Sequence, residues 1–465
     1  MKPLVNSPSA RDIAYVMHPY TNLKTHQTEG PLILREGKGV WVTDDAGNKY
    51  IEGMAGLWCC SLGYSEERLV EAATAQMRKL PFHHFFTGKS HEPGIDLAER
   101  LIKMAPAPMS KVFFANSGSE ANDTVVKLVW YYNNALDRPK KKKIISRIKA
   151  YHGVTVAAAS MTGLPNNHRD FDLPIANITH TECPHYWRYG KPGESEEDFA
   201  TRMAEALEQK ILAEGGAATC AAFIAEPVMG SCGVVVPPKT YFEKIQAVLR
   251  KYDMLMVADE VICGFGRTGN MFGSQTYNIK PDMMVVAKAL SSAYLPISAV
   301  LVNETIWNAL VKQSEKIGVF AHGYTYSAHP VAAAVALETL KIYEERDIVA
   351  HIKRIGPRLQ NGLAKFAGHP LVGEVRGVGL MAAVELVKDK ASKANFDGKL
   401  GVGGYLIKRG QAHGAILRSV VGDVICFSPP LIINEQEIDL LLERFGKALD
   451  DTLAWVRQNG HAKAA

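Results

Sequence analysis

Cysteine is scarce in this chain, with seven residues among 465. An odd number of cysteines in a chain without a secretory signal argues against a disulfide framework. Cys59 and Cys60 are adjacent, so they cannot form a CxxC pair. The remaining five show no zinc-ligand spacing; they are Cys183, Cys220, Cys232, Cys263 and Cys426. We therefore expect reduced thiols and no metal.

Long apolar runs and a strong charge bias are also missing. No uninterrupted apolar run approaches the ~18 residues of a membrane span, and residues 1–15 lack the apolar core of a signal peptide. The 53 basic and 48 acidic residues give a formal net charge of +5, and the one basic run, 140–143, has no interleaved aromatic residues. We therefore expect a cytoplasmic protein with no membrane partner and no nucleic-acid partner.

The composition, 47% hydrophobic and 22% charged, is that of an ordinary globular protein. Short apolar runs alternate with helical patterns, which indicates an α/β fold with a mostly parallel sheet and helices on both faces. The predicted strands are 111–116, 143–148, 221–227, 254–260, 283–288 and 297–302, and the clearest helices are 197–214 and 240–252. After about residue 330 the pattern changes to long helices around a Gly-rich strand region, 373–387.

Two charged residues each follow an apolar strand pattern. Lys288 ends one such run and Asp259 another. Burial disfavours the charged form of a lysine and makes it a nucleophile for carbonyls, while an aspartate can hold a positive charge opposite. Pyridoxal phosphate needs both: a lysine for its aldehyde and an acid for its ring nitrogen. Taken alone, each residue also fits a simpler role, a solvated lysine and a helix-capping aspartate.

The segment 116–119, Asn-Ser-Gly-Ser, follows a predicted strand and opens a helical pattern. Backbone N–H groups and the positive end of the helix would face a phosphate there. Gly118 permits close backbone approach, and the hydroxyls of Ser117 and Ser119 can donate further hydrogen bonds. A simple helix cap is the alternative interpretation of the same residues.

Six strings in order carry a family resemblance over nearly the whole chain. They are NSGSEANDT (116–124), YHG (151–153), EPV (226–228), VADEVICGFGRTG (257–269), AKALSS (287–292) and HGYTYSAHP (322–330). Together they resemble the class III aminotransferases, which have fold type I of the pyridoxal-phosphate enzymes. Residues 53–59 and 417–423 are similar to the amine:pyruvate, or omega, branch. The resemblance implies a large cofactor-binding domain, 59–329, and a smaller α+β domain formed by 1–58 and 330–465.

The resemblance also implies roles for individual residues. Lys288, Asp259 and Glu226 would be catalytic, with Glu226 near the ring hydroxyl of the cofactor. Tyr151 would lie against one face of the ring and Val261 against the other; an extended segment after Asp259 would point both side chains the same way. Core packing is the alternative for Tyr151. The full cofactor set is Ser117, Gly118, Ser119, Tyr151, His152, Glu226, Asp259, Val261, Ile262, Lys288, Tyr324 and Thr325.

In this family Thr325 comes from the partner subunit, which implies a homodimer, with a tetramer left open. Arg418 would bind the carboxylate of a keto acid and swing away when the amine donor has none. Residues in the positions that line the family's substrate pockets are Tyr20, Trp58, Phe86 and Ser231, although core packing is an alternative for the three aromatics. The chain departs from the pattern at Ala289 and Ala293, where many relatives have glycine.

The implied reaction is the transfer of an amino group from a primary amine or omega-amino acid to a keto acid, with pyruvate giving alanine. Lys288 would attach the cofactor covalently and then act as general acid and base. Two alternatives stay open: an aminomutase or decarboxylating aminotransferase on the same scaffold, and a cofactor-binding protein without turnover.

Overall fold

The computed structural model of the chain describes residues 6–460. The first five residues of the predicted segment 1–58 and the last five of 330–465 therefore lie outside the described residues. Within the described range, no helix combines the length and apolarity needed to cross a membrane. All seven cysteines lie in this range and are free thiols, as the sequence predicts.

A seven-stranded sheet forms the centre of the molecule, in the order β4-β10-β9-β8-β7-β5-β6. Its strands are β4 (Lys111–Ala115), β5 (Lys143–Arg147), β6 (Ile178–Thr181), β7 (Cys220–Ala225), β8 (Leu255–Asp259), β9 (Met283–Val286) and β10 (Ser298–Val302). Strand β10 runs antiparallel to both neighbours, and the other pairs are parallel. The predicted mostly parallel sheet and its six strands are confirmed, whereas β6 was missed.

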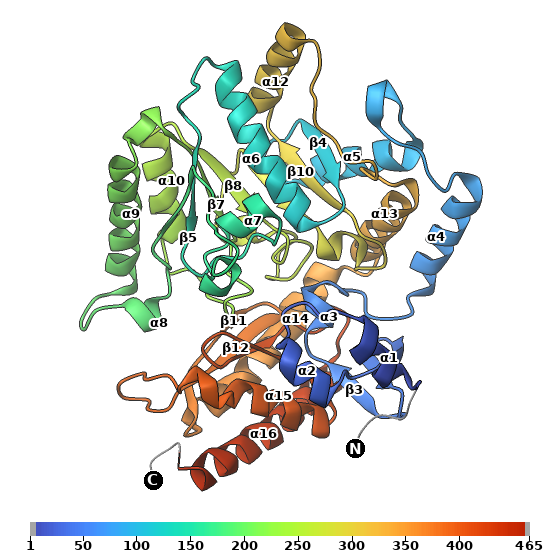
Figure 1. The fold of residues 1–465 in the computed structure, drawn as a ribbon, viewed down its shortest axis with the longest axis vertical. Helices are drawn as coiled ribbons and strands as arrows, with labels where there is room; N and C mark the ends of the chain where they lie inside the picture. Colours follow the sequence, from blue (N-terminus) through green and yellow to red (C-terminus); the bar gives the residue numbers. More distant parts are fainter. Residues whose placement is uncertain (1–5, 461–465) are drawn as a thin grey trace.

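Both faces of this sheet are buried, because successive residues of each strand point to opposite sides. In β8, Met256 and Ala258 belong to one apolar cluster and Val257 to another. Helices α5 (Glu92–Met104), α9 (Glu196–Ala213) and α10 (Tyr241–Lys251) supply side chains to the first cluster. Helices α6 (Gly118–Ala135), α7 (Val156–Met161) and α12 (Glu304–Ile317) supply the second. The predicted three-layer arrangement is confirmed, as are the helices predicted at 197–214 and 240–252 (Figure 1).

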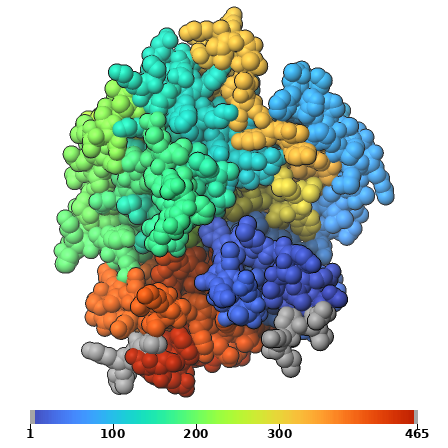
Figure 2. Space-filling view, in the orientation of Figure 1, coloured from blue at the N-terminus to red at the C-terminus, as the bar shows by residue number. Residues whose placement is uncertain are grey.

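Two four-stranded sheets lie below the central sheet in Figure 1, in the part that holds both ends of the chain. The first contains β1 (Leu34–Lys38), β2 (Trp41–Asp44), β3 (Lys49–Glu52) and β13 (Ala415–Ile416). The second contains β11 (Val372–Val378), β12 (Met381–Leu386), β15 (Val424–Phe427) and β14 (Arg418–Val420). Strand β3 pairs in parallel with β13, so segments from near the two ends of the chain share a sheet. Figure 2 shows these blue and orange-red segments side by side.

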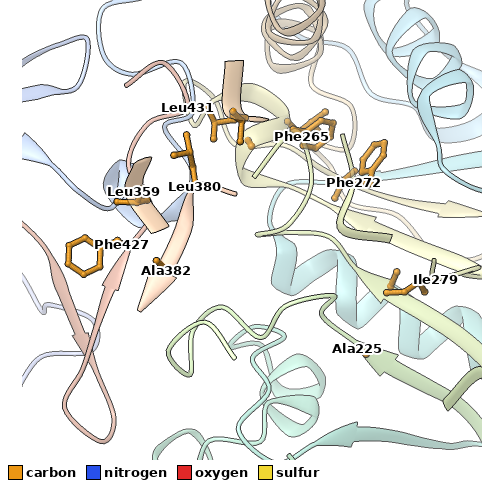
Figure 3. Close-up of a cluster of buried hydrophobic side chains, with 14 of the residues drawn as sticks. Ala225, Phe265, Phe272, Ile279, Leu359, Leu380, Ala382, Phe427 and Leu431 are labelled. Atoms are coloured by element: carbon orange, nitrogen blue, oxygen red, sulfur yellow. The ribbon is translucent and has the colours of Figure 1, made fainter. Parts of the chain in front are cut away.

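The predicted domain boundaries stay predictions, because packing is continuous across them. Helix α13 (Pro330–Glu345) opens the predicted C-terminal segment but packs on α4 (Glu67–Lys79) and α5 of the predicted large domain. One apolar cluster contains Phe265 and Phe272 from the loop after β8 together with Leu380 and Leu431 (Figure 3).

The remaining elements are mostly short. The helices are α1 (Pro8–Tyr15), α2 (Leu23–Glu29), α3 (Ala55–Trp58), α8 (Tyr186–Tyr189), α11 (Gly273–Thr276), α14 (Ile348–Ala364), α15 (Val402–Ala412) and α16 (Glu435–Gln458). The 3-10 turns are η1 (Phe86–Gly88), η2 (Pro165–Asn167), η3 (Gly216–Ala218), η4 (Lys288–Ser291), η5 (Lys365–Gly368) and η6 (Gly398–Leu400).

Candidate active site

A cavity of about 360 Å³ opens where the strands of the central sheet end. Lys288 follows β9, Asp259 ends β8 and Glu226 follows β7. These three strands are parallel, so their carboxyl ends meet at one edge, where open α/β sheets bind ligands. Ten of the predicted cofactor residues line this cofactor cavity: Ser117, Gly118, Ser119, Tyr151, His152, Glu226, Asp259, Val261, Ile262 and Lys288.

Lys288 begins the turn η4 with a left-handed backbone, φ 50°. A residue with a Cβ is strained in this region by roughly 1–3 kcal/mol, and such strain is typical of functional sites. Burial lowers the pKa of the Lys288 ammonium, and the negative charges of Asp259 and Glu226 raise it in part. The amine is therefore more easily deprotonated than that of an exposed lysine, as a nucleophile for an aldehyde requires.

The carboxylate of Asp259 is fixed by hydrogen bonds on both oxygens. His152 Nδ1 lies 2.7 Å from Oδ2, and Asn122 Nδ2 donates to the same oxygen at 2.9 Å. The N–H of Val261 donates to Oδ1 at 3.1 Å. Asp259 is only 3% exposed, so its negative charge is held in one orientation away from water.

Asn122 is a site residue that the sequence reasoning missed. Its amide also donates to the His152 carbonyl at 2.7 Å, so it joins His152 and Asp259 into one network. The spacing carried a signal: Asn122 stands four residues after Gly118 in α6, which places both on one face of the helix. Asn122 and the neighbouring Asn116 both line the cofactor cavity.

Glu226 is buried at the end of β7 and accepts two backbone hydrogen bonds. Oε1 accepts from the N–H of Tyr151 at 3.1 Å and Oε2 from the N–H of Gly230 at 2.9 Å. Burial raises the pKa of Glu226, and the charges of His152 and Arg147 lower it in part. Glu226 thus joins the Tyr151 loop to the strand end at the cofactor cavity.

The start of α6 forms the opposite end of the cofactor cavity. Ser117 is the N-cap, with Oγ accepting from the N–H of Glu120 at 3.2 Å, so the capping interpretation holds for this hydroxyl. A Cβ on Gly118 would lie 3.2 Å from the Val261 side chain, and one on Gly153 would lie 2.5 Å from Ser119 Oγ. Glycine at both positions lets backbone approach closely around the positive end of the helix, as a phosphate site requires.

The expected extended segment after Asp259 is wrong. Residues 261–268 form consecutive turns, because β8 ends at Asp259 and the N–H of Val261 folds back onto that carboxylate. Asp259 and Val261 still both line the cofactor cavity. The turn after β8, and not the alternation of side chains along a strand, places them on the same side.

Tyr151 lies between the cofactor cavity and the predicted substrate residues. Burial raises its pKa, the neighbouring Tyr20 hydroxyl adds to this, and the positive charge of Arg418 lowers it in part. The Tyr20 ring is 64% exposed, and its hydroxyl accepts from Asn167 Nδ2 at 2.6 Å. Tyr20 and Arg418 therefore lie near the aromatic ring that is predicted to cover the cofactor.

Trp58 and Arg418 are in direct contact. The guanidinium carbon of Arg418 lies 5.3 Å from the centre of the Trp58 ring, within cation–π range. Trp58 is 3% exposed and packs in an apolar cluster with Ile262, which lines the cofactor cavity. Trp58 thus packs with a residue of the cavity wall and Arg418 contacts Trp58, although neither lines the cavity itself.

The other predicted residues lie outside the cavity wall of this single chain. Phe86 is 44% exposed and covers Gly323, where a Cβ would lie 2.9 Å from Phe86 Cζ. Ser231 is half-buried in the turn after Gly230. Thr325 is exposed, and the Tyr324 hydroxyl donates to the Glu120 carbonyl at 3.0 Å. Their assigned roles stay predictions.

The residues present fit pyridoxal phosphate. The cavity offers a lysine amine whose pKa is lowered by burial, a fixed carboxylate and a glycine-lined helix start within one volume. Two buried polar atoms beside Asp259, His152 Nε2 and Asn122 Oδ1, have no partner among the described residues, so the network retains unused hydrogen-bonding capacity.

Comparison with known proteins agrees with this site. The family described as "Aminotransferase class-III" matches residues 23–449. A probable mitochondrial gamma-aminobutyrate transaminase 2 of Oryza sativa subsp. indica is 57% identical over 92% of this chain and 86% of that protein. A vanillin aminotransferase of Capsicum frutescens is 54% identical over 91% and 92%.

A solved structure is similar along almost the whole chain. The omega transaminase of Pseudomonas jessenii, in complex with PMP, is 59% identical, covers 97% of this chain and 99% of its own, and superimposes with a TM-score of 0.95. The resemblance stated from the sequence is thereby confirmed. The chain belongs to the class-III aminotransferases, which have fold type I and depend on pyridoxal 5'-phosphate.

Proposed function

We propose that this aminotransferase moves the amino group of a primary amine or omega-amino acid to pyruvate, giving alanine. One observation carries the choice of acceptor. Arg418 rests on the Trp58 ring, and no carboxylate of residues 6–460 forms an ion pair with it. A guanidinium next to the site and free of a protein anion is suited to bind the carboxylate of a keto acid bidentately.

The residues of the cofactor cavity have distinct tasks in this reaction. Pyridoxal phosphate, when bound, supplies an electron-accepting ring. Asp259 holds a positive charge in place, because His152 and Asn122 prevent its carboxylate from turning. Lys288 first holds the cofactor covalently and then carries the proton at the reacting carbon, for which its lowered pKa is suited. Tyr151 limits the space on one side of the cofactor cavity.

The proposed donor carries no carboxylate beside its amino group. Tyr20, whose hydroxyl neighbours Tyr151, and Trp58, which packs with Ile262 of the cavity wall, would place aromatic side chains near such a molecule. Similar chains bear names that refer to gamma-aminobutyrate and vanillin, and one engineered relative is described for bulky amines. These names support a donor with a remote or absent carboxylate.

We also propose a homodimer, in which Thr325 completes the phosphate site of the partner subunit. Thr325 is exposed, and exposed apolar side chains stand near it in the sequence, namely Tyr326 at 59% and Val319 at 60%. Such surface favours burial in an interface. Sedimentation at assay concentration tests this, because an active monomer would contradict the proposal.

The function is tested with the holoenzyme and a panel of amines, each incubated with pyruvate, with 2-oxoglutarate and with no acceptor. We expect stoichiometric alanine formation with pyruvate. Glutamate formed in place of alanine would overturn the acceptor assignment. An isomerised donor without acceptor would indicate an aminomutase, and release of CO₂ a decarboxylating enzyme. The cytoplasmic location stays a prediction, which cell fractionation would test.

A further inference from the structure

Three potential metal ligands meet at the N-terminal end, and none of them lines the cofactor cavity. Asp12 lies in α1, His26 in α2, and His18 in the loop between them. His18 Nε2 and His26 Nε2 each lie 2.9 Å from the same oxygen, Asp12 Oδ1. The two imidazole rings are 4.3 Å apart between centroids. We call Asp12, His18 and His26 the N-terminal triad.

The donor set and geometry of this triad match a zinc site. Two imidazole nitrogens and one carboxylate are ligands that zinc prefers, at ~2.0–2.2 Å. A tetrahedral ion with such bonds separates its ligand atoms by roughly 3.4 Å. The two Nε2–Oδ1 contacts of 2.9 Å would therefore open by about 0.5 Å, which a side-chain rotation provides.

The triad also has room for a fourth ligand. The side chains are 29%, 16% and 9% exposed for His18, Asp12 and His26, so the cluster is shielded on one side and open to water on the other. No other ion pair of Asp12 is present among residues 6–460. The expectation of no metal rested on the cysteine spacing alone and did not consider these histidines.

A second cluster of potential metal ligands differs from the N-terminal triad because arginines already pair with its carboxylates. His185, Glu374 and Glu385 also have ligand atoms close together. There, however, Arg376 lies between the two glutamates and Arg188 pairs with Glu385. The carboxylates are already neutralised by guanidinium groups, so a cation would have to displace them. Among residues 6–460, no arginine or lysine forms an ion pair with Asp12 of the N-terminal triad.

We propose that the N-terminal triad binds a divalent transition metal ion, with Zn²⁺ as the ion whose ligand preference it fits. The ion would join α1, α2 and the loop between them. This loop carries Tyr20, whose hydroxyl neighbours Tyr151 at the cofactor cavity. Metal binding would thus hold the Tyr20 loop in place beside the active site. The proposal does not depend on which amine or keto acid the enzyme uses.

The test uses tag-free holoenzyme, dialysed against chelator and then against Zn²⁺, with bound metal measured by mass spectrometry. We expect one equivalent of Zn²⁺ per wild-type chain and binding at least about tenfold weaker in His26→Gln and Asp12→Asn. The Zn²⁺-dependent rise in denaturation temperature should disappear in the same variants. The visible absorption of bound cofactor shows whether each variant is folded.

His413→Gln is the matched control. His413 Nε2 lies 2.7 Å from Asp451 Oδ2, a histidine–carboxylate pair without a second imidazole. This variant should bind Zn²⁺ as the wild type does. Ca²⁺, a hard cation that prefers oxygen ligands, should produce no shift. Equal Zn²⁺ binding in wild type and triad variants, or none in the wild type, would overturn the proposal. The triad would then serve only to hydrogen-bond α1 to α2 and to the loop between them.

Discussion

His152 Nδ1 lies 2.7 Å from Asp259 Oδ2, and both side chains are closed to solvent. Asn122 donates to the same oxygen, so the carboxylate is oriented before any cofactor arrives. Electrostatic stabilisation of this kind costs no reorganisation during the reaction. We therefore expect His152 and Asn122 to fix the orientation in which the Asp259 carboxylate would face a bound cofactor.

Replacing Asp259 by asparagine should slow amino transfer by about 10² to 10⁴, which corresponds to several kcal/mol. A neutral amide keeps the shape of the side chain but cannot hold a positive charge. Single-turnover absorbance measures the rate. The matched control is Asp282→Asn, which alters a carboxylate at the other end of the sheet, bonded to Met256 N and Asn303. Rates within threefold of wild type for Asp259→Asn would remove it from this role.

Covalent capture of pyridoxal phosphate by the apoenzyme should depend on pH through Lys288. Only the neutral amine reacts, and burial lowers the Lys288 pKa below the ordinary 10.5, so capture should persist to lower pH than for an exposed lysine. Asp259 raises this pKa in part, so Asp259→Asn should move the midpoint further down. Borohydride reduction and mass spectrometry give the profile.

Two lysine variants check this assignment. Lys288→Ala should bind cofactor only non-covalently and lose multiple turnover. Lys141→Ala is the matched control, because Lys141 is also buried and has a lowered pKa but donates to the Tyr252 carbonyl outside the site. A reduced cofactor adduct on a lysine other than Lys288 would contradict the assignment of Lys288 as the cofactor-binding lysine.

Removing Arg418 should separate the two halves of the reaction. Arg418→Ala deletes a charge-assisted contact of roughly 1.5–3 kcal/mol, which lowers keto-acid affinity about 10- to 150-fold. The half-reaction with a carboxyl-free amine should change much less. Arg444→Ala is the matched control, since Arg444 also lies 5.3 Å from a tryptophan ring, that of Trp41, away from the cavity. Equal losses in both halves would show that Arg418 does not select the carboxylate.

Ala293→Gly should stabilise the enzyme by up to about 1 kcal/mol, because a left-handed backbone penalises a Cβ. Ala293 lines the cofactor cavity with φ 63°. Ala289 lacks a left-handed backbone, so Ala289→Gly should destabilise by roughly 0.5–1 kcal/mol. Denaturation temperatures of the two variants measure the contrast. A lower temperature for Ala293→Gly would mean that neighbouring contacts outweigh the strain.

The central sheet was predictable because strands buried on both faces read as continuous apolar runs. Strand β6 was missed because its residues, Ile-Thr-His-Thr, include only one apolar side chain and form an edge of the sheet, so they give no apolar run. The antiparallel direction of β10 also leaves no trace in composition. Strand direction depends on the path of the connecting chain, which local pattern does not encode.

The meeting of Lys288, Asp259 and Glu226 at one cavity was predictable because each ends or follows a strand, and parallel strands bring their ends together; their catalytic roles stay predictions. Asn122 was missed since its role depends on a contact across 137 positions of sequence, from α6 to β8. The prediction of an extended segment at Val261 was wrong because the chain turns directly after β8. Tyr324 and Thr325 lie outside the cavity of one chain, and the predicted role of Thr325 depends on a second copy.

The pairing of β3 with β13 joins two distant parts of the chain outside the central sheet. Trp58 follows β3 and Arg418 begins β14, directly after β13, whereas Lys288, Asp259 and Glu226 all belong to the central sheet. Trp58 and Arg418, two of the predicted substrate residues, are thus anchored outside the sheet that carries the predicted catalytic residues, whereas Ser231 follows central strand β7. Substitutions at Trp58 and Arg418 should therefore change which amines are accepted while the cofactor cavity keeps its geometry, which would make this scaffold adaptable to new donors.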